Sequence, residues 1–159
     1  LPTDLFALSV YPIAPYLNNG RVLPSDYLEV FSTLQAAPLA VAETGYPSQD
    51  ISGLVGGTCV VGLASSPADQ QQWARRLLDD AERLAMPFVT WWANEDPMPA
   101  ADLAGCTCST GTAWCDFLSM LPPEGQNGFR YFGTMGLRAF DGTPRPALGD
   151  WTAAIASVR

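Results

Sequence analysis

Short apolar runs alternate along the chain with longer segments in which apolar residues recur at helical spacing. Three of the runs have the length and the β-branched or aromatic content of strands, and they cover residues 5–11, 38–44 and 87–92. The middle run is apolar throughout from Pro38 to Ala42, which is typical of a strand buried on both faces of a parallel sheet. Alternating strands and helices with right-handed crossovers predict an α/β architecture.

Helices are expected between and after these strands. One runs from Ser25 to about Ala36, and a second covers 67–85, with Ser66 as its N-cap and Pro67 in its first turn. A last helix is expected to end near Val158. The segment 45–65 is rich in Gly and Ser and is interpreted as a surface loop over a site. Its Gly56-Gly57 pair is followed by no Lys and does not resemble a phosphate-binding loop.

The number of strand–helix units limits the fold. A complete (β/α)8 barrel needs roughly 250 residues, whereas this chain has 159 residues and three such units are visible. We therefore expect one domain over residues 1–159, a partial or half TIM barrel of about three to four βα units with parallel strands. Two long loops, 45–65 and 98–130, carry the cysteines, and the second includes a short helix near 114–120. Three strands leave two free edges, so another copy, another chain or the protein's own loops would complete the barrel.

Charge and composition narrow the chemistry. The net charge is −8, and all eight basic residues are Arg, so the chain disfavours nucleic acid. It contains no His, the commonest general base and metal ligand, so acid–base work falls to carboxylates or Tyr and no metal or cofactor is indicated. No apolar stretch approaches the roughly 20 residues that cross a bilayer. The first residues do not form a signal peptide, and the chain reads as a mature or truncated piece.

Four cysteines indicate the compartment. Cys59, Cys106, Cys108 and Cys115 lack the paired spacing of a four-cysteine zinc site, so disulfides in a secreted protein are favoured. A bridge between Cys106 and Cys108 would be strained. Cys59 is therefore expected to pair with one of the other three, and the remaining two with each other, with the connectivity left open.

Polar and aromatic residues gather where the three strands end. Because the carboxyl ends of parallel strands meet at one edge, these side chains are expected to form one site. Carboxylates beside aromatic faces suit a sugar, and glycoside hydrolysis needs two carboxylates but no His or metal. Strand alternation turns only one of the two adjacent Trp side chains toward this site. The residues are Ser9 and Tyr11, then Glu43 and Tyr46, then Trp91, Trp92, Asn94, Glu95 and Asp96.

Three of these segments also carry a resemblance. The sequences LSVYP (8–12), AETGYP (42–47) and FVTWW (88–92) resemble the sixth, seventh and eighth strands of (β/α)8-barrel glycoside hydrolases of the retaining clan that includes β-galactanases and cellulases. Segment 136–148 is similar to the last turn before the final helix of those enzymes. The resemblance implies that Glu43 is the nucleophile and that Tyr11 hydrogen-bonds it. It also implies that Trp91 or Trp92 is the platform under the sugar.

The acid/base Glu of that family lies on the fourth strand, which has no counterpart here. Glu95 or Asp96 takes that role if it lies roughly 5–5.5 Å from Glu43, or supports inversion at roughly 6.5–9.5 Å. Otherwise a partner supplies the acid, for example in a homodimer. With no Gly-x-Ser-x-Gly elbow and no His, a serine esterase is disfavoured.

The predicted function is a secreted glycoside hydrolase, or its C-terminal half, acting on β-linked polysaccharide. The alternative is a catalytically weak carbohydrate-binding half-barrel that lacks the acid.

Overall fold

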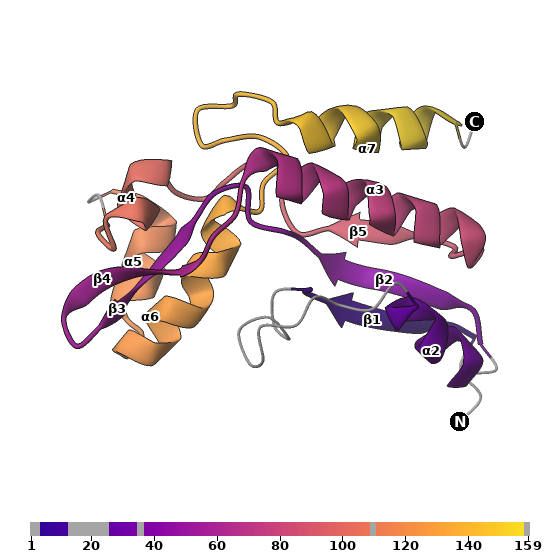
Figure 1. The fold of residues 1–159 in the computed structure, drawn as a ribbon, viewed down its shortest axis with the longest axis horizontal. Coiled ribbons are helices and arrows are strands. Elements are labelled where there is room, and N and C mark those ends of the chain that lie inside the picture. Colours follow the sequence, from indigo (N-terminus) through magenta and orange to yellow (C-terminus); the bar gives the residue numbers. More distant parts are fainter. Residues whose placement is uncertain (1–3, 13–25, 35–36, 109–110, 158–159) are drawn as a thin grey trace.

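The computed structural model of the protein describes residues 4–12, 26–34, 37–108 and 111–157. Within them the chain forms a three-stranded sheet, a separate hairpin and several helices (Figure 1). The strands are β1 (Phe6–Val10), β2 (Leu39–Thr44), β3 (Ile51–Val55), β4 (Thr58–Leu63) and β5 (Val89–Trp91). The helices are α2 (Tyr27–Leu34), α3 (Pro67–Arg83), α4 (Ala100–Ala104), α5 (Ala113–Ser119), α6 (Pro123–Arg130), the 3-10 helix η1 (Tyr131–Thr134) and α7 (Pro146–Ser157).

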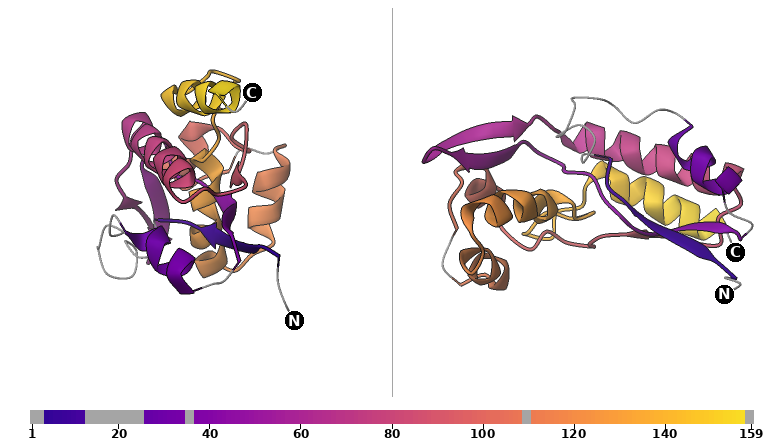
Figure 2. Two further views of the ribbon diagram at one scale, coloured as in Figure 1. Left: turned by 90° about the vertical axis from the view of Figure 1, so that its right-hand side faces the viewer. Right: turned by 90° about the horizontal axis from the view of Figure 1, so that it is seen from below.

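The larger part of the molecule, which we call the sheet layer, consists of β1, β2 and β5 with helices α2, α3 and α7. The strands are parallel in the order β1-β2-β5, so the middle strand is the one predicted to be buried on both faces. The three helices cover one face of the sheet and share its apolar core, which includes Leu28, Val41, Leu77, Trp91 and Ala147. Figure 2 shows these helices on one side of the strands. The α/β partial barrel predicted from the sequence is confirmed, and the described strands do not close into a barrel.

The opposite face of the sheet, which we call the open face, carries exposed residues from all three strands. Ala7, Ser9, Ala42 and Thr90 are exposed there, and Phe88 is 43% exposed just before β5. In a parallel sheet both faces are usually covered. The open face is therefore the surface that a complete barrel would enclose.

Helix α3 begins as its sequence predicts. The Ser66 side chain accepts a hydrogen bond from the Asp69 amide, and Pro67 occupies the first turn, where its missing N–H has no partner to lose. The helix ends at Arg83, two residues before the predicted end. For α2 the predicted cap Ser25 and the predicted end near Ala36 lie outside the described residues.

The second part of the molecule, which we call the disulfide lobe, comprises the β3–β4 hairpin and helices α4, α5 and α6. It differs in part from the two loops predicted over 45–65 and 98–130. The first contains the hairpin and the second contains α4 and α6, whereas α5 matches the short helix predicted near 114–120. In the hairpin, Gly56 and Gly57 have φ values of 56° and 81°, the left-handed conformation that a two-residue hairpin turn requires and that Gly adopts without strain. In Figure 1 the arrowheads of β1 and β2 point toward this lobe, which thus lies beyond the carboxyl edge of the sheet.

Two disulfides hold the lobe together. Cys59 on β4 is bonded to Cys106 just after α4, and Cys108 is bonded to Cys115 in α5. The prediction that Cys59 pairs with one of the three clustered cysteines, and the other two with each other, is confirmed. Asn127 of α6 adds a non-covalent link, because its side-chain amide both accepts from the Leu54 N–H (2.9 Å) and donates to the Leu54 carbonyl (3.0 Å).

The segment 136–145 ties the end of β5 to the last helix. Asp96 is 4% exposed, its carboxylate accepts from the Gly136 amide at 2.8 Å, and Arg145 binds it through both terminal guanidinium nitrogens. A side chain at Gly136 would meet the backbone of Glu95 and Asp96 at 2.5–2.6 Å, so only Gly permits this approach. Among the described residues no helix is long and apolar enough to span a membrane.

Candidate active site

Glu43 lies at the carboxyl end of the middle strand. Leu8 pairs with Val41 and Ser9 pairs with Glu43, so Ala42 is an extra residue in β2, a β-bulge directly before the carboxylate. Val41 is fully buried toward the helices, and the bulge lets Glu43 follow it on the open face, where it is only partly buried. Bulges of this kind are common next to active sites because they re-aim a side chain.

Two hydroxyl groups from β1 and its end flank the Glu43 carboxylate. Ser9 Oγ donates a hydrogen bond to Glu43 Oε2 at 3.3 Å. The Tyr11 hydroxyl is buried, and the pKa of Tyr11 is raised above its ordinary value, first by burial and then by the neighbouring Glu43 carboxylate. Among the described residues, no group forms a hydrogen bond of standard geometry with the Tyr11 oxygen. Tyr11 is therefore a close neighbour of Glu43 without a formed hydrogen bond to it. Tyr11 therefore stays protonated at neutral pH, with a proton available to the carboxylate.

The adjacent Trp91 and Trp92 point to opposite faces of the sheet, as strand geometry requires. Trp91 is 7% exposed, donates its indole N–H to the Met135 carbonyl at 2.6 Å and packs against Trp151 of α7. It therefore contributes to the core between sheet and helices. Trp92 is 37% exposed, and its ring contacts Phe132, which also contacts Tyr11. Of the two, Trp92 is available to a ligand at the carboxyl edge.

Phe132 completes the surroundings of Glu43, and sequence reasoning missed it. Its ring contacts Tyr11 edge to face, with centroids 5.1 Å apart, and Trp92 at 5.0 Å. It lies in η1, just after the predicted loop 98–130, in a stretch for which no helix or strand was predicted. The spacing of Phe129 and Phe132, one helical turn apart, is the signal that could have drawn attention to them.

The polar residues after β5 differ in how far they are buried and in the groups that they contact. Asn94 and Glu95 are exposed, and the backbone of Glu95 bridges to that of Arg138. Asp96 is buried in its ion pair with Arg145. Burial raises the pKa of Asp96, and the hydrogen bonds and charge of Arg145 offset this only in part. Its carboxylate thus holds segment 136–145 to the sheet, which gives Asp96 a structural role.

Tyr46 lies between the two parts of the molecule. Its ring is partly buried against both the sheet core and a small cluster of Ile51, Leu63 and Met135, which we call the junction cluster. Tyr11 and Phe132 also pack against the junction cluster. The fully buried Gln70 of α3 donates to the carbonyls of Tyr46 (3.0 Å) and Gly136 (3.1 Å). The carboxyl edge of the sheet is thus fixed from the helical side.

A groove of about 840 Å³ lies elsewhere. It is open to solvent and runs between α2 and α3 on the helical side, lined by Glu29, Arg75, Asp79, Arg83 and their neighbours. We do not assign the active site to this groove, because its charged groups largely pair with one another. Arg83, for example, pairs with Glu29 and Asp80. Among the described residues no cluster of His, Cys, Asp or Glu could hold a metal ion.

No family model matches this chain, and no curated protein matches it. Among solved structures it is similar to the GH2 β-galacturonidase from Eisenbergiella tayi bound to galacturonate, with a TM-score of 0.54 and 17% identity over 97% of this chain and 24% of that chain. The β-glucuronidase from Bifidobacterium dentium gives a TM-score of 0.52 and 12% identity, covering 96% of this chain and 21% of that one. The β-glucuronidase from Faecalibacterium prausnitzii gives 0.51 and 16%, covering 98% and 22%.

The chain spans less than a quarter of the length of each of these structures. At such low identity the likeness concerns the fold. The protein has a partial, barrel-like α/β fold of the kind found in glycoside hydrolases.

Proposed function

We propose that this chain forms part of a secreted β-glycoside hydrolase in which Glu43 is the nucleophile. One observation carries the proposal: Glu43 follows a bulge at the carboxyl end of the middle strand and faces the open side between the Ser9 and Tyr11 hydroxyls. The exposed Trp92 is linked to Tyr11 through the ring of Phe132. The carboxyl edge of a parallel sheet is where the catalytic residues of α/β folds usually lie.

Each neighbour has a part in the proposed reaction. The Glu43 carboxylate attacks the anomeric carbon, and a covalent glycosyl–enzyme bond forms as the bond to the leaving oxygen breaks. Ser9 donates a hydrogen bond to one oxygen of the Glu43 carboxylate, and the protonated Tyr11 can donate a second one. Together these two hydroxyls fix the orientation of the carboxylate. Trp92 offers an aromatic face to the apolar side of the sugar ring.

A second carboxylate must protonate the leaving group and then activate water. Glu95 is exposed at the end of β5 and is our candidate on this chain. Asp96, bound to Arg145, is not. A carboxylate from another chain or from another part of a longer protein is the alternative source of the acid. That a second copy completes the barrel stays a prediction, and the mass of the protein in solution tests it.

The similar structures are glycosidases of β-linked uronic acids, which supports a β-linked sugar as the substrate class of this chain. The two disulfides support a secreted protein, because such bonds persist in oxidising compartments.

Covalent labelling tests the nucleophile. Fluorosugars with a dinitrophenyl leaving group need little acid catalysis, so the intermediate should accumulate even where the acid/base is weak or missing. Peptide mass spectrometry is expected to find the label on Glu43, and the Glu43→Gln variant should take up none. A label on any other residue, or turnover that survives Glu43→Gln, overturns the assignment.

Azide rescue separates the roles of Glu43 and Glu95. In Glu43→Ala, azide enters from the side that the carboxylate vacated and should yield the α-glycosyl azide. In Glu95→Ala, azide should attack the glycosyl–enzyme and yield the β-glycosyl azide. If neither variant yields the β-glycosyl azide, Glu95 is not the acid/base residue of the mechanism.

The carbohydrate-binding alternative is favoured by one observation: open-face residues from all three strands are exposed, while the Asp96 carboxylate is held in its ion pair with Arg145. If fluorosugars leave no label while Glu43→Gln still binds sugar, the protein binds carbohydrate without cleaving it.

A further inference from the structure

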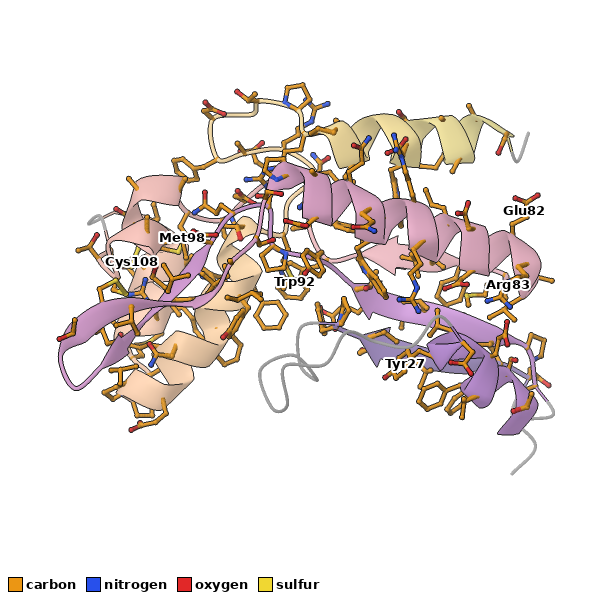
Figure 3. All side chains as sticks on the ribbon, in the orientation of Figure 1. Tyr27, Glu82, Arg83, Trp92, Met98 and Cys108 are labelled. Carbon is orange, nitrogen blue, oxygen red and sulfur yellow. A yellow bond between two sulfur atoms is a disulfide. The ribbon has the colours of Figure 1, made fainter. Side chains whose placement is uncertain are left out.

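A row of aromatic rings runs from the proposed active site into the disulfide lobe. Starting at Trp92, the Phe132 ring lies 5.0 Å away, and the Phe129 ring lies 5.9 Å from Phe132. We call these three residues the aromatic strip. Figure 3 labels Trp92 between the sheet and the lobe, where the strip begins. Phe132 also contacts Tyr11, the neighbour of Glu43, so the strip adjoins the catalytic carboxylate.

The strip is open at both ends. Phe129 is 39% exposed and Trp92 is 37% exposed, while Phe132 between them is partly buried. Exposed aromatic side chains at the rim of a site leave apolar surface in water and are a recurrent sign of a binding surface. Sugar rings present apolar C–H faces, so a row of aromatic faces suits successive units of a carbohydrate chain.

The lobe holds the strip in place before any ligand arrives. Behind Phe129, the rings of Phe117 (5.1 Å) and Trp114 (6.4 Å) pack against it. Cys115, between these two residues in sequence, is bonded to Cys108, and Asn127 fastens α6 to the hairpin. A platform that is already rigid costs little conformational entropy on binding.

We propose that the aromatic strip binds further units of a neutral, β-linked oligosaccharide beyond the unit bound at Glu43. This inference rests on the proposed function and names its substrate class. A neutral chain is favoured because the strip has no charge, the proposed site holds Glu43 and Glu95, and the protein carries a net charge of −8, which repels polyuronates. The protein would thus differ from the uronate-specific glycosidases whose fold it shares.

The ring angles further define the ligand. Phe129 and Phe132 are tilted by 38°, and Phe132 and Trp92 by 59°, so the strip is stepped rather than flat. A stepped surface suits a single, twisted chain in solution. It does not suit the flat face of a crystalline polysaccharide, which needs coplanar rings.

The test is calorimetric titration of the protein with neutral β-linked gluco- and galacto-oligosaccharides, from disaccharide to hexasaccharide. Affinity is expected to rise with chain length. Phe129→Ala should weaken hexasaccharide binding by about threefold to tenfold, with a smaller loss for the disaccharide. Phe129→Leu keeps an apolar side chain in the lobe but removes the flat face, and it should show a similar loss with a nearly unchanged melting temperature. That pattern separates stacking from a damaged lobe.

Phe140→Ala is the matched control, because Phe140 is 42% exposed but lies outside the strip. It should bind every oligosaccharide as the unaltered protein does. Affinity that does not depend on chain length, an equal loss in Phe140→Ala, or tighter binding of a galacturonate hexasaccharide overturns the proposal. Titration needs no turnover. A protein that binds long chains through Phe129 but takes no label on Glu43 would overturn the proposed function alone, and a labelled protein without length dependence would overturn the strip alone.

Discussion

The sheet layer is held mainly by apolar burial, whereas the disulfide lobe relies on covalent bonds around a smaller core. In the first, strands and helices far apart in sequence share one continuous set of buried side chains. In the second, the buried cluster consists of Met98, Leu103, Cys115 and Leu118, and two disulfides surround it. Small cores contribute too little burial to fold alone and are commonly reinforced by such bonds. The proposed active site lies where these two kinds of structure meet.

The contrast matters at the junction cluster, where Tyr11, Tyr46 and Phe132 pack around Ile51, Leu63 and Met135. The sheet layer supplies Glu43 and Trp92, and the lobe leads into Phe132. Changes to either part should therefore reach the site, but they should differ in size and in the region that unfolds.

The largest loss is expected from Arg145→Met in the sheet layer. This change leaves the Asp96 carboxylate buried without its partner, which should lower the free energy of unfolding by about 3–5 kcal/mol. Arg75→Met is the control, because Arg75 pairs with Asp150 while its own side chain is 60% exposed, and its loss should cost about 0–1 kcal/mol. Urea unfolding of both variants is the measurement. Equal losses would mean that the Asp96 pair does not stabilise the sheet layer.

Removal of the disulfides should affect the lobe instead. The chain separation is 47 residues for Cys59–Cys106 and 7 for Cys108–Cys115, so replacing both cysteines of the first pair by Ala should cost more, within a range of about 2–4 kcal/mol. Hydrogen exchange should show lost protection in β3, β4 and α4, with the amides of β1 and β2 still protected. Loss of protection throughout the chain would show that the two parts unfold as one unit.

A smaller effect is expected from Thr44→Val in β2. The fully buried Thr44 hydroxyl donates to the Val10 carbonyl at 2.6 Å and accepts from the Trp73 indole N–H at 3.1 Å. Removing the hydroxyl takes a hydrogen-bond partner from both groups, at a cost of about 1–3 kcal/mol. Thr90→Val on the exposed face of β5 should change stability by less than about 0.5 kcal/mol. Thermal unfolding of the pair measures the difference, and equal melting temperatures would contradict it.

The smallest effect concerns pH. Because the pKa of Tyr11 is raised in the folded state, the unfolded chain loses this proton first as the pH passes about 10. The stability that Tyr11 contributes is therefore complete below pH 10 and falls above it, by at most about 1.4 kcal/mol per pH unit. Tyr11→Phe should flatten this alkaline decline. Burial also raises the pKa of Tyr131, so some decline should remain. An unchanged slope in Tyr11→Phe would refute the contribution.

The sheet layer could be predicted from the sequence and the lobe largely could not. Uninterrupted apolar strands and a capped helix at Ser66 are strong local signals. The hairpin was missed because its Gly and Ser content outweighed the apolar runs on either side of Gly56-Gly57, a recognised two-residue turn signal. Helix α5 matches the short helix predicted near 114–120, whereas α4 and α6 have at most eight residues, too few for a clear period.

At the site, the ends of the strands were predicted, but the environment of each side chain was not. Sequence order cannot show that Asp96 meets Arg145 from another loop, or that the Trp91 indole faces the Met135 carbonyl. Phe132 comes from a segment with no catalytic motif. Its place beside Tyr11 depends on how the lobe packs against the sheet, which is a tertiary property.

The bulge at Ala42 has an evolutionary consequence. Because Ala42 is the unpaired residue, deleting it would let Glu43 follow Val41 in regular alternation and still face the open side. The loss of one codon would thus give a more regular ladder and leave the carboxylate on the open face. The bulge therefore absorbs a one-residue insertion that would otherwise turn Glu43 toward the helices. A lineage could thus gain or lose this residue while keeping both its sheet and the face on which Glu43 lies.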